Sequence, residues 1–93
     1  MSYKLKMIAL IAEFLGTFAL LTAIFFTGNW LMIGLTLAIV VWAIGGISGG
    51  HVNPAVTFAM YLKGGMSGTK VMSYYAAQFL GAAAAYYTYA ALV

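Results

Sequence analysis

Residues 48–57 read SGGHVNPAVT, and the Asn53-Pro54 pair in this stretch is a strong helix start. Asparagine is a favoured N-cap residue, and proline is favoured at the first helical position because an N–H there has no helical partner to lose. A helix from Asn53 to about Leu62 would be roughly 15 Å long, which is half of the hydrocarbon core of a bilayer. The glycines that follow Lys63 then end it. This segment predicts a short helix that cannot cross a membrane by itself.

The composition around this stretch is that of a membrane protein. Hydrophobic residues make up 66% of the 93 residues and charged residues only 5%, whereas charged residues are about a quarter of an ordinary soluble domain. The chain has no cysteine, which excludes disulfides, thiolate metal sites and cysteine nucleophiles. Its four lysines are too few for a nucleic-acid-binding surface. The sequence favours an integral membrane protein in a lipid bilayer, with no nucleic-acid partner, no cofactor and no enzyme active site.

Three apolar runs are long enough to cross a bilayer core, which takes about 20 residues of helix. They cover about residues 5–27, 30–47 and 70–93. The first run is too long for a secretory signal peptide and offers no convincing cleavage site. Together with a half-helix at about 53–62, these runs predict an all-α membrane protein. Residues 1–93 would form a single repeat of three transmembrane helices and one re-entrant half-helix.

The lysines predict the orientation of the chain in the membrane. All of them lie at the amino terminus or in the connection before the third span, at Lys4, Lys6, Lys63 and Lys70. Three spans and a re-entrant loop place both regions on the same membrane face, and lysine-rich segments stay in the cytoplasm. We therefore expect a protein of the cell membrane with its amino terminus in the cytoplasm.

The depth of Asn53 decides what the half-helix does. If residues 45–52 dip into the membrane, Asn53 reaches the mid-plane, and the free N–H groups and positive dipole end of the helix point at the bilayer centre. Irregular backbone at that depth is tolerated only inside protein or beside a water-filled path. Transporters use broken helices to place such helix ends at a substrate. The alternative is an amphipathic helix on the membrane surface, which a bare Asn-Pro pair would favour.

The wider sequence favours the re-entrant arrangement. Residues 48–57 match the first-half signature of the aquaporin, or major intrinsic protein, family. The resemblance extends to residues 12–17, AEFLGT, and to residues 77–82, AQFLGA, in the order and spacing of that family. It covers essentially the whole chain. The chain therefore resembles the amino-terminal half of such a protein, which is one of two inverted repeats whose half-helices meet at the mid-plane.

The resemblance implies a passive membrane channel for water, or for glycerol and other small neutral solutes. Asn53 would donate hydrogen bonds to permeating water, while Pro54 and Ala55 would start and pack the half-helix. Ile33 stands where the family forms one wall of its outer constriction, and because many water-selective members have an aromatic residue there, the smaller side chain fits a wider path. Val56, directly after the Asn-Pro-Ala motif, is expected to say little about selectivity. A homo-oligomer is also implied, a tetramer by resemblance to the family.

Three polar residues are expected to hold the re-entrant loop. Glu13 is the only acidic residue, and burying it unpaired in a membrane span would cost about a few kcal/mol or more. The resemblance suggests that Glu13 braces the loop by accepting hydrogen bonds from His51 and from loop N–H groups, and Gln78 is expected to give similar support. A proton-carrying Glu13 is the alternative. A metal site at His51 is disfavoured, because the sequence has no second histidine and no cysteine.

Three glycines within the predicted spans are expected to be close-packing points between helices. Small residues let helix backbones approach one another in lipid, where no hydrophobic driving force brings helices together. These glycines are Gly16, Gly34 and Gly81. We expect a helix–helix contact at each of them.

One half-helix cannot make a two-sided pore, so the resemblance requires a complementary second half. The rest of a longer chain, a separate chain or an inverted copy of this chain could supply it. The inverted copy ranks lowest, because a protein that inserts both ways should lack a lysine bias. The apolar end of the sequence at Val93 favours a piece of a longer protein. Two other functions remain open: a small proton-coupled multidrug exporter that uses Glu13, and a non-conducting fragment or assembly subunit.

Overall fold

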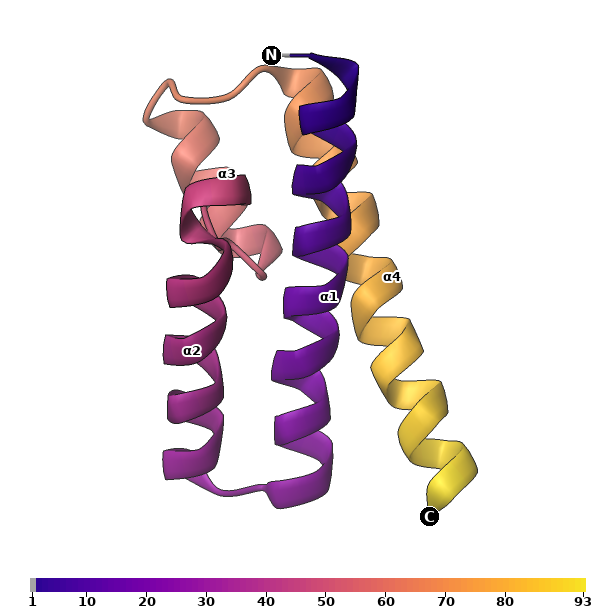
Figure 1. The fold of residues 1–93 in the computed structure, drawn as a ribbon. Coiled ribbons are helices and arrows are strands. Elements are labelled where there is room, and N and C mark those ends of the chain that lie inside the picture. Colours follow the sequence, from indigo (N-terminus) through magenta and orange to yellow (C-terminus); the bar gives the residue numbers. More distant parts are fainter. Residues whose placement is uncertain (1) are drawn as a thin grey trace.

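Four helices make up residues 2–93, the part of the chain that the computed structural model describes (Figure 1). They are α1 (Tyr3–Thr27), α2 (Trp30–Ser48), α3 (Pro54–Leu62) and α4 (Gly68–Leu92). None of the described residues lies in a β-strand. The expectation of an all-α protein is therefore confirmed.

Two of these helices, α1 and α2, are long and apolar enough to cross a membrane. The helix α4 has the same 25-residue length as α1 but is richer in alanine, tyrosine and glycine. Its mean hydropathy is therefore lower, and length and hydropathy alone do not identify it as a membrane span. The molecule measures 39 × 24 × 21 Å along its principal axes. Its long dimension is close to the thickness of a bilayer with headgroups, about 40 Å. That α4 is a third span stays a prediction.

The helix ends follow from local chemistry. Gly28 ends α1 in the left-handed region with a φ of 55°, and its N–H donates to the carbonyl of Ile24 at 3.1 Å. Asn29 directly after it begins α2, where its side-chain oxygen accepts from the N–H groups of Leu31 and Met32, each at 3.0 Å. A turn this short leaves no room for the helices to diverge, so α1 and α2 run antiparallel side by side (Figure 1).

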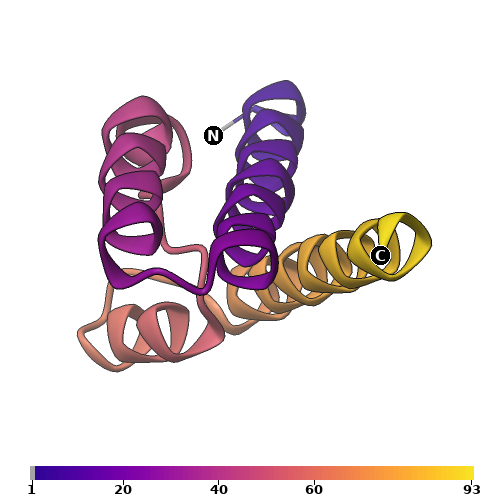
Figure 2. The same cartoon turned by 90° about the horizontal axis from the view of Figure 1, so that it is seen from below.

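The helix α1 lies between its neighbours. It packs against α2 on one side and α4 on the other, and α3 packs against α4. Seen along the bundle in Figure 2, α2 and α4 lie on different sides of α1, and α3 lies below α2. Among the glycines, the least space is at Gly81 of α4, where an added Cβ would lie only 2.5 Å from the carbonyl oxygen of Phe14. Glycine at this position lets the α4 backbone rest directly on the α1 backbone.

The two ends of the molecule differ in charge. Figure 1 shows the amino terminus and the connection from α3 to α4 at one end, and the carboxyl terminus and the α1–α2 turn at the other. All four lysines belong to the first end, since two lie in the first turns of α1 and two flank the α3–α4 connection. The membrane face to which this basic end belongs stays a prediction.

Candidate functional site

The connection between α2 and α3 turns the chain back into the bundle. The helix α2 ends at Ser48, and Gly49 and Gly50 follow with φ angles of 95° and 63°. Figure 1 shows the loop passing inward from the end of α2, so that α3 begins near the middle of the molecule's height and rises toward the amino-terminal end. The start of α3 therefore lies inside the molecule and not at its end.

Val52 takes an unusual backbone conformation in this loop. Its φ is 46°, and it is the one non-glycine residue with positive φ among residues 2–93. A β-branched residue held there stores strain of about 1–3 kcal/mol unless its surroundings offset it. The side chain is only 3% exposed and packs over Gly16, where an added Cβ would meet Val52 Cγ1 at 2.7 Å. The Val52 side chain can pack at this position because Gly16 has no side chain.

Glu13 of α1 accepts the hydrogen bonds that fix this loop. Its side chain is completely buried. Oε2 accepts from the hydroxyl of Ser48 at 2.6 Å and from the backbone N–H of His51 at 3.0 Å. Oε1 accepts from the backbone N–H of Val52 at 2.8 Å and from the side-chain amide of Gln78 at 3.0 Å. Four donors converge on a group that only accepts when it is ionised, so the surroundings match a charged carboxylate.

A chain of hydrogen bonds continues from Glu13 through α4 to α3. Gln78 Nε2 donates to Thr57 Oγ1 at 2.8 Å, and this hydroxyl lies 2.9 Å from Nδ1 of His51. The amide nitrogen of Gln78 must face Glu13, because a carboxylate cannot donate, and its second hydrogen then goes to Thr57. The Thr57 hydroxyl keeps its own hydrogen for Nδ1, which makes Nδ1 an acceptor. We therefore expect neutral His51 to carry its proton on Nε2.

Tyr74 of α4 ties down the end of α2. Its hydroxyl donates to the backbone carbonyl of Ser48 at 2.7 Å, and its ring centre lies 5.1 Å from that of His51. The helices α2 and α4 do not pack against each other directly. Tyr74 therefore joins them by a side-chain hydrogen bond, and α1 packs against both helices.

The loop peptides present their carbonyl groups away from Glu13. All peptide bonds among the described residues are trans, and in a trans peptide the N–H and the preceding carbonyl point in opposite directions. The N–H groups of His51 and Val52 point at Glu13. The carbonyl groups of Gly50 and His51 therefore face the opposite side of the loop, where they are acceptors without a role in bracing it.

Asn53 caps α3 through one half of its side-chain amide. Its Oδ1 accepts from the N–H of Ala55 at 2.8 Å, and Pro54 occupies the first helical position. The Asn53 side chain is exposed, and the structure gives its Nδ2 no hydrogen bond to any of the described residues. Capping thus engages the amide oxygen and leaves the two N–H donors without a partner among the described residues.

The structure brings together some of the residues singled out from the sequence and separates others. Glu13, His51 and Gln78 meet at the loop, but His51 donates to Glu13 through its backbone, while its ring pairs with Thr57. Ile33 is half-buried near the beginning of α2. Its apolar side chain is not part of the hydrogen-bonded cluster. The expected close packing at Gly34 has no counterpart among the described residues, because a Cβ there would meet none of their atoms within 4 Å.

Sequence reasoning missed three members of the cluster, Ser48, Thr57 and Tyr74. Ser48 and Thr57 are the first and last residues of the stretch 48–57, but the sequence pattern assigned no function to either side chain. Tyr74 lies four residues before Gln78 and so on the same face of α4, and this spacing was the available signal. No group of three metal-ligating side chains occurs in the part of the chain that the structure describes.

Comparison with known proteins gives a consistent result. The family model described as major intrinsic protein matches residues 2–93. "Aquaporin Z" of Brucella melitensis is 42% identical over a region that covers 80% of this chain and 39% of the relative. "Glycerol uptake facilitator protein-like 6" of Lactiplantibacillus plantarum is 47% identical, covering 77% and 38%, and human "Aquaporin-9" is 40% identical, covering 77% and 30%. The chain spans less than half the length of each of these relatives.

Proposed function

The chain belongs to the major intrinsic protein family, and we propose that it supplies one half of a passive membrane pore for water or small neutral solutes. The observation that carries this proposal is the amide of Asn53. Its oxygen already accepts from the N–H of Ala55, whereas its two N–H donors have no partner among the described residues and are available to a passing molecule. A water molecule that meets this group must present its oxygen, which fixes its orientation.

The surrounding backbone supports the same use. The carbonyl groups of Gly50 and His51 face away from Glu13 and can accept hydrogen bonds from the permeating molecule. A permeating molecule would meet these carbonyl acceptors first and then the N–H donors of Asn53. These groups would replace, one after another, the hydrogen bonds that the molecule makes in bulk water. The positive dipole end of α3 at Asn53 disfavours cations, as is known of aquaporin-type pores in general. This combination suits neutral, hydrogen-bonding solutes.

The cluster around Glu13 is proposed to be structural. The side chain of Glu13 is fully buried, and its two oxygens already accept hydrogen bonds from four donors of the loop and of Gln78. Its role in the proposal is to hold the loop, together with Gln78 and His51. These contacts favour the channel over the proton-coupled exporter, which would need a carboxyl group open to protons and substrate.

In a membrane, we place α1, α2 and α4 as spans and α3 as the re-entrant half-helix. The helix α4 has 25 residues, about 37 Å of helix, and packs along α1, so that a bilayer thick enough for one contains the other. The nine residues of α3 are too few to cross. The basic end would face the cytoplasm, since all four lysines are there.

The solute that passes depends on the width of the pore. Ile33 is proposed as one wall of the outer constriction and Val56 as a residue next to the pore motif. Relatives of this chain include both an aquaporin and a glycerol uptake facilitator, by their names. We therefore include glycerol-sized solutes together with water.

A complete pore needs a second half with its own half-helix. The proposal is a second repeat in a longer chain or in a separate chain, assembled into a homo-oligomer. An inverted copy of this chain is disfavoured, because the lysines at one end would fall on the outer face in half of the molecules.

Osmotic flux tests the proposal directly. Proteoliposomes that contain the complete assembly, including its second half, are mixed with hyperosmotic sucrose or glycerol and followed by stopped-flow light scattering. We expect faster shrinkage in sucrose than for empty vesicles, or faster reswelling as glycerol enters, without proton or cation flux. Shrinkage and reswelling no faster than in empty vesicles would leave a non-conducting subunit as the better description.

A further inference from the structure

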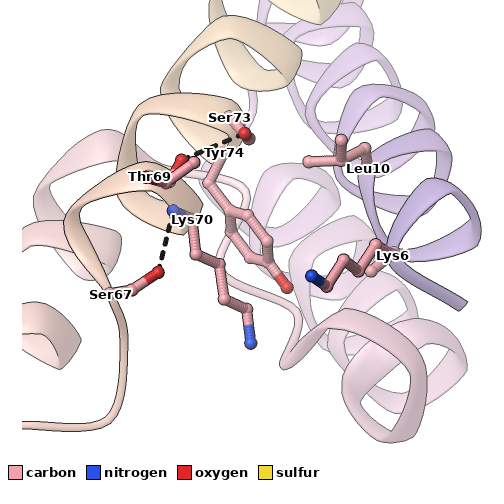
Figure 3. Close-up of a pocket in the computed structure, with 8 residues that line it drawn as sticks. Lys6, Leu10, Ser67, Thr69, Lys70, Ser73 and Tyr74 are labelled. Carbon is pink, nitrogen blue, oxygen red and sulfur yellow. Dashed lines mark hydrogen bonds between the residues drawn. The ribbon is translucent and has the colours of Figure 1, made fainter. Parts of the chain in front are cut away.

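A pocket opens between α1 and α4 at the basic end of the molecule (Figure 3). Its volume is about 220 Å³, and Lys6 of α1 and Lys70 of α4 lie in its walls. Figure 3 shows the Lys6 side chain reaching from α1 toward Tyr74, and the Lys70 side chain running beside the Tyr74 ring. Lys70 Nζ lies 5.7 Å from the centre of that ring. Two ammonium groups from different helices therefore share one opening.

The chain has no acidic side chain to neutralise these two charges. Glu13 is its only acidic residue, and it is fully buried with both oxygens engaged by the loop and by Gln78. Like charges that face the same small cavity repel each other, and less so when an anion lies between them. The pocket is therefore most favourable when it holds a negatively charged group from outside the chain.

The rest of the pocket wall suits an oxyanion with an apolar extension. The Thr69 hydroxyl has no hydrogen bond to the described residues, so it can donate to an anion beside the lysines. The N–H of Lys70 donates to the Ser67 hydroxyl at 3.2 Å, and the two N–H groups before it, at the positive end of α4, have no helical partners. Ala9 and Leu10 form the apolar part of the wall. Charged donors next to an apolar surface at the end of a membrane protein match an amphipathic ligand better than a free ion.

We propose that this pocket binds the phosphate group of an anionic phospholipid from the leaflet that faces the basic end. Lys6 and Lys70 hold the phosphate oxygens, and Ala9 and Leu10 contact the glycerol and acyl part. Basic pockets between transmembrane helices are known to take lipid phosphates in this way. Asn53 is not among the residues that line this pocket.

Native mass spectrometry of the purified protein in detergent micelles tests the proposal. The probes are phosphatidylglycerol and phosphatidylcholine with the same acyl chains. We expect phosphatidylglycerol to bind more tightly, and the double variant K6Q/K70Q to lose about tenfold or more of that affinity, because two charge-assisted hydrogen bonds disappear. The variant K6R/K70R keeps the charges and should keep the binding.

The matched control is K4Q/K63Q, which removes the same charge from the same end of the molecule but leaves the pocket intact. It should bind phosphatidylglycerol nearly as well as the unmodified protein. Equal losses in both double variants, or equal binding of the two lipids, would overturn the site. Displacement of the lipid by a similar concentration of inorganic phosphate would overturn the assignment to a lipid. Circular dichroism of each variant checks that the helices remain, and a flux assay reports separately on the pore.

Discussion

Gln78 donates to Glu13 at 3.0 Å, although the two residues are 65 positions apart in the sequence. They occupy the same place in two similar hexapeptides, AEFLGT at 12–17 and AQFLGA at 77–82. The helices α1 and α4 that carry these hexapeptides run in the same direction and pack against each other (Figure 1). The carboxylate and the amide therefore lie at the same depth, and the α1–α4 pair carries the loop that positions Asn53.

Replacing the carboxylate tests whether it holds the loop. In Glu13→Gln one oxygen becomes an NH₂ group that faces other donors, among them the hydroxyl of Ser48 or the N–H of Val52. We expect the free energy of unfolding to fall by about 3 kcal/mol or more, measured by denaturation in detergent micelles. Thr88→Ala is the control, because its hydroxyl bonds only its own helix. Equal stability of the two variants would contradict the bracing role.

The hydrogen-bond direction at Thr57 predicts the tautomer of His51. Nitrogen NMR of labelled protein should show neutral His51 with its proton on Nε2. Thr57→Val removes the hydroxyl and leaves Gln78 Nε2 and His51 Nδ1 each without this partner, which should cost about 1–3 kcal/mol of stability. Thr57→Ser keeps the hydroxyl and should keep the tautomer. A proton on Nδ1 in the unmodified protein would show instead that His51 donates to the Thr57 hydroxyl.

The three glycines should respond differently to alanine. In Gly81→Ala the new methyl group meets the backbone of Phe14, which cannot move without separating α1 from α4, so we expect a loss of about 2–3 kcal/mol. In Gly16→Ala the nearest atom belongs to the side chain of Val52, and a smaller loss is expected. Gly34→Ala meets nothing within 4 Å of its new Cβ and serves as the control. Comparable unfolding midpoints for all three variants would refute this ranking.

Substitutions of Asn53 can distinguish its capping of α3 from its proposed donation of hydrogen bonds to the permeating molecule. Asn53→Asp keeps an oxygen that can accept from the N–H of Ala55 but removes both side-chain donors. We expect the stability of α3 to be kept and water flux through the complete assembly to fall severalfold. Asn53→Ala should also lose the cap, at about 1 kcal/mol. Stopped-flow shrinkage of proteoliposomes measures the flux, and unchanged flux in Asn53→Asp would argue against a donor role for this amide.

Much of the fold could be predicted because its signals are local. Gly28 and Asn29 end one helix and begin the next, and Asn53 with Pro54 begins the short one, each through its own backbone conformation or side-chain oxygen. The loop partners could be predicted only in part. Glu13 was singled out because a lone carboxylate in an apolar run needs donors, but the sequence does not say which donors. Gly34 looked like Gly16, and only the arrangement of the helices separates a packed glycine from an exposed one.

The sequence by itself determined that the chain is helical and apolar, that α3 is too short to cross a membrane, and that the lysines gather toward one end. These properties depend on composition, helix length and capping residues, which act within a few positions of each other. Only the tertiary structure decided that Ser48, Thr57 and Tyr74 join the site, that Val52 adopts positive φ over Gly16, and that Lys6 and Lys70 share a pocket. These contacts join residues of different helices, and their distances depend on how α1, α2 and α4 pack.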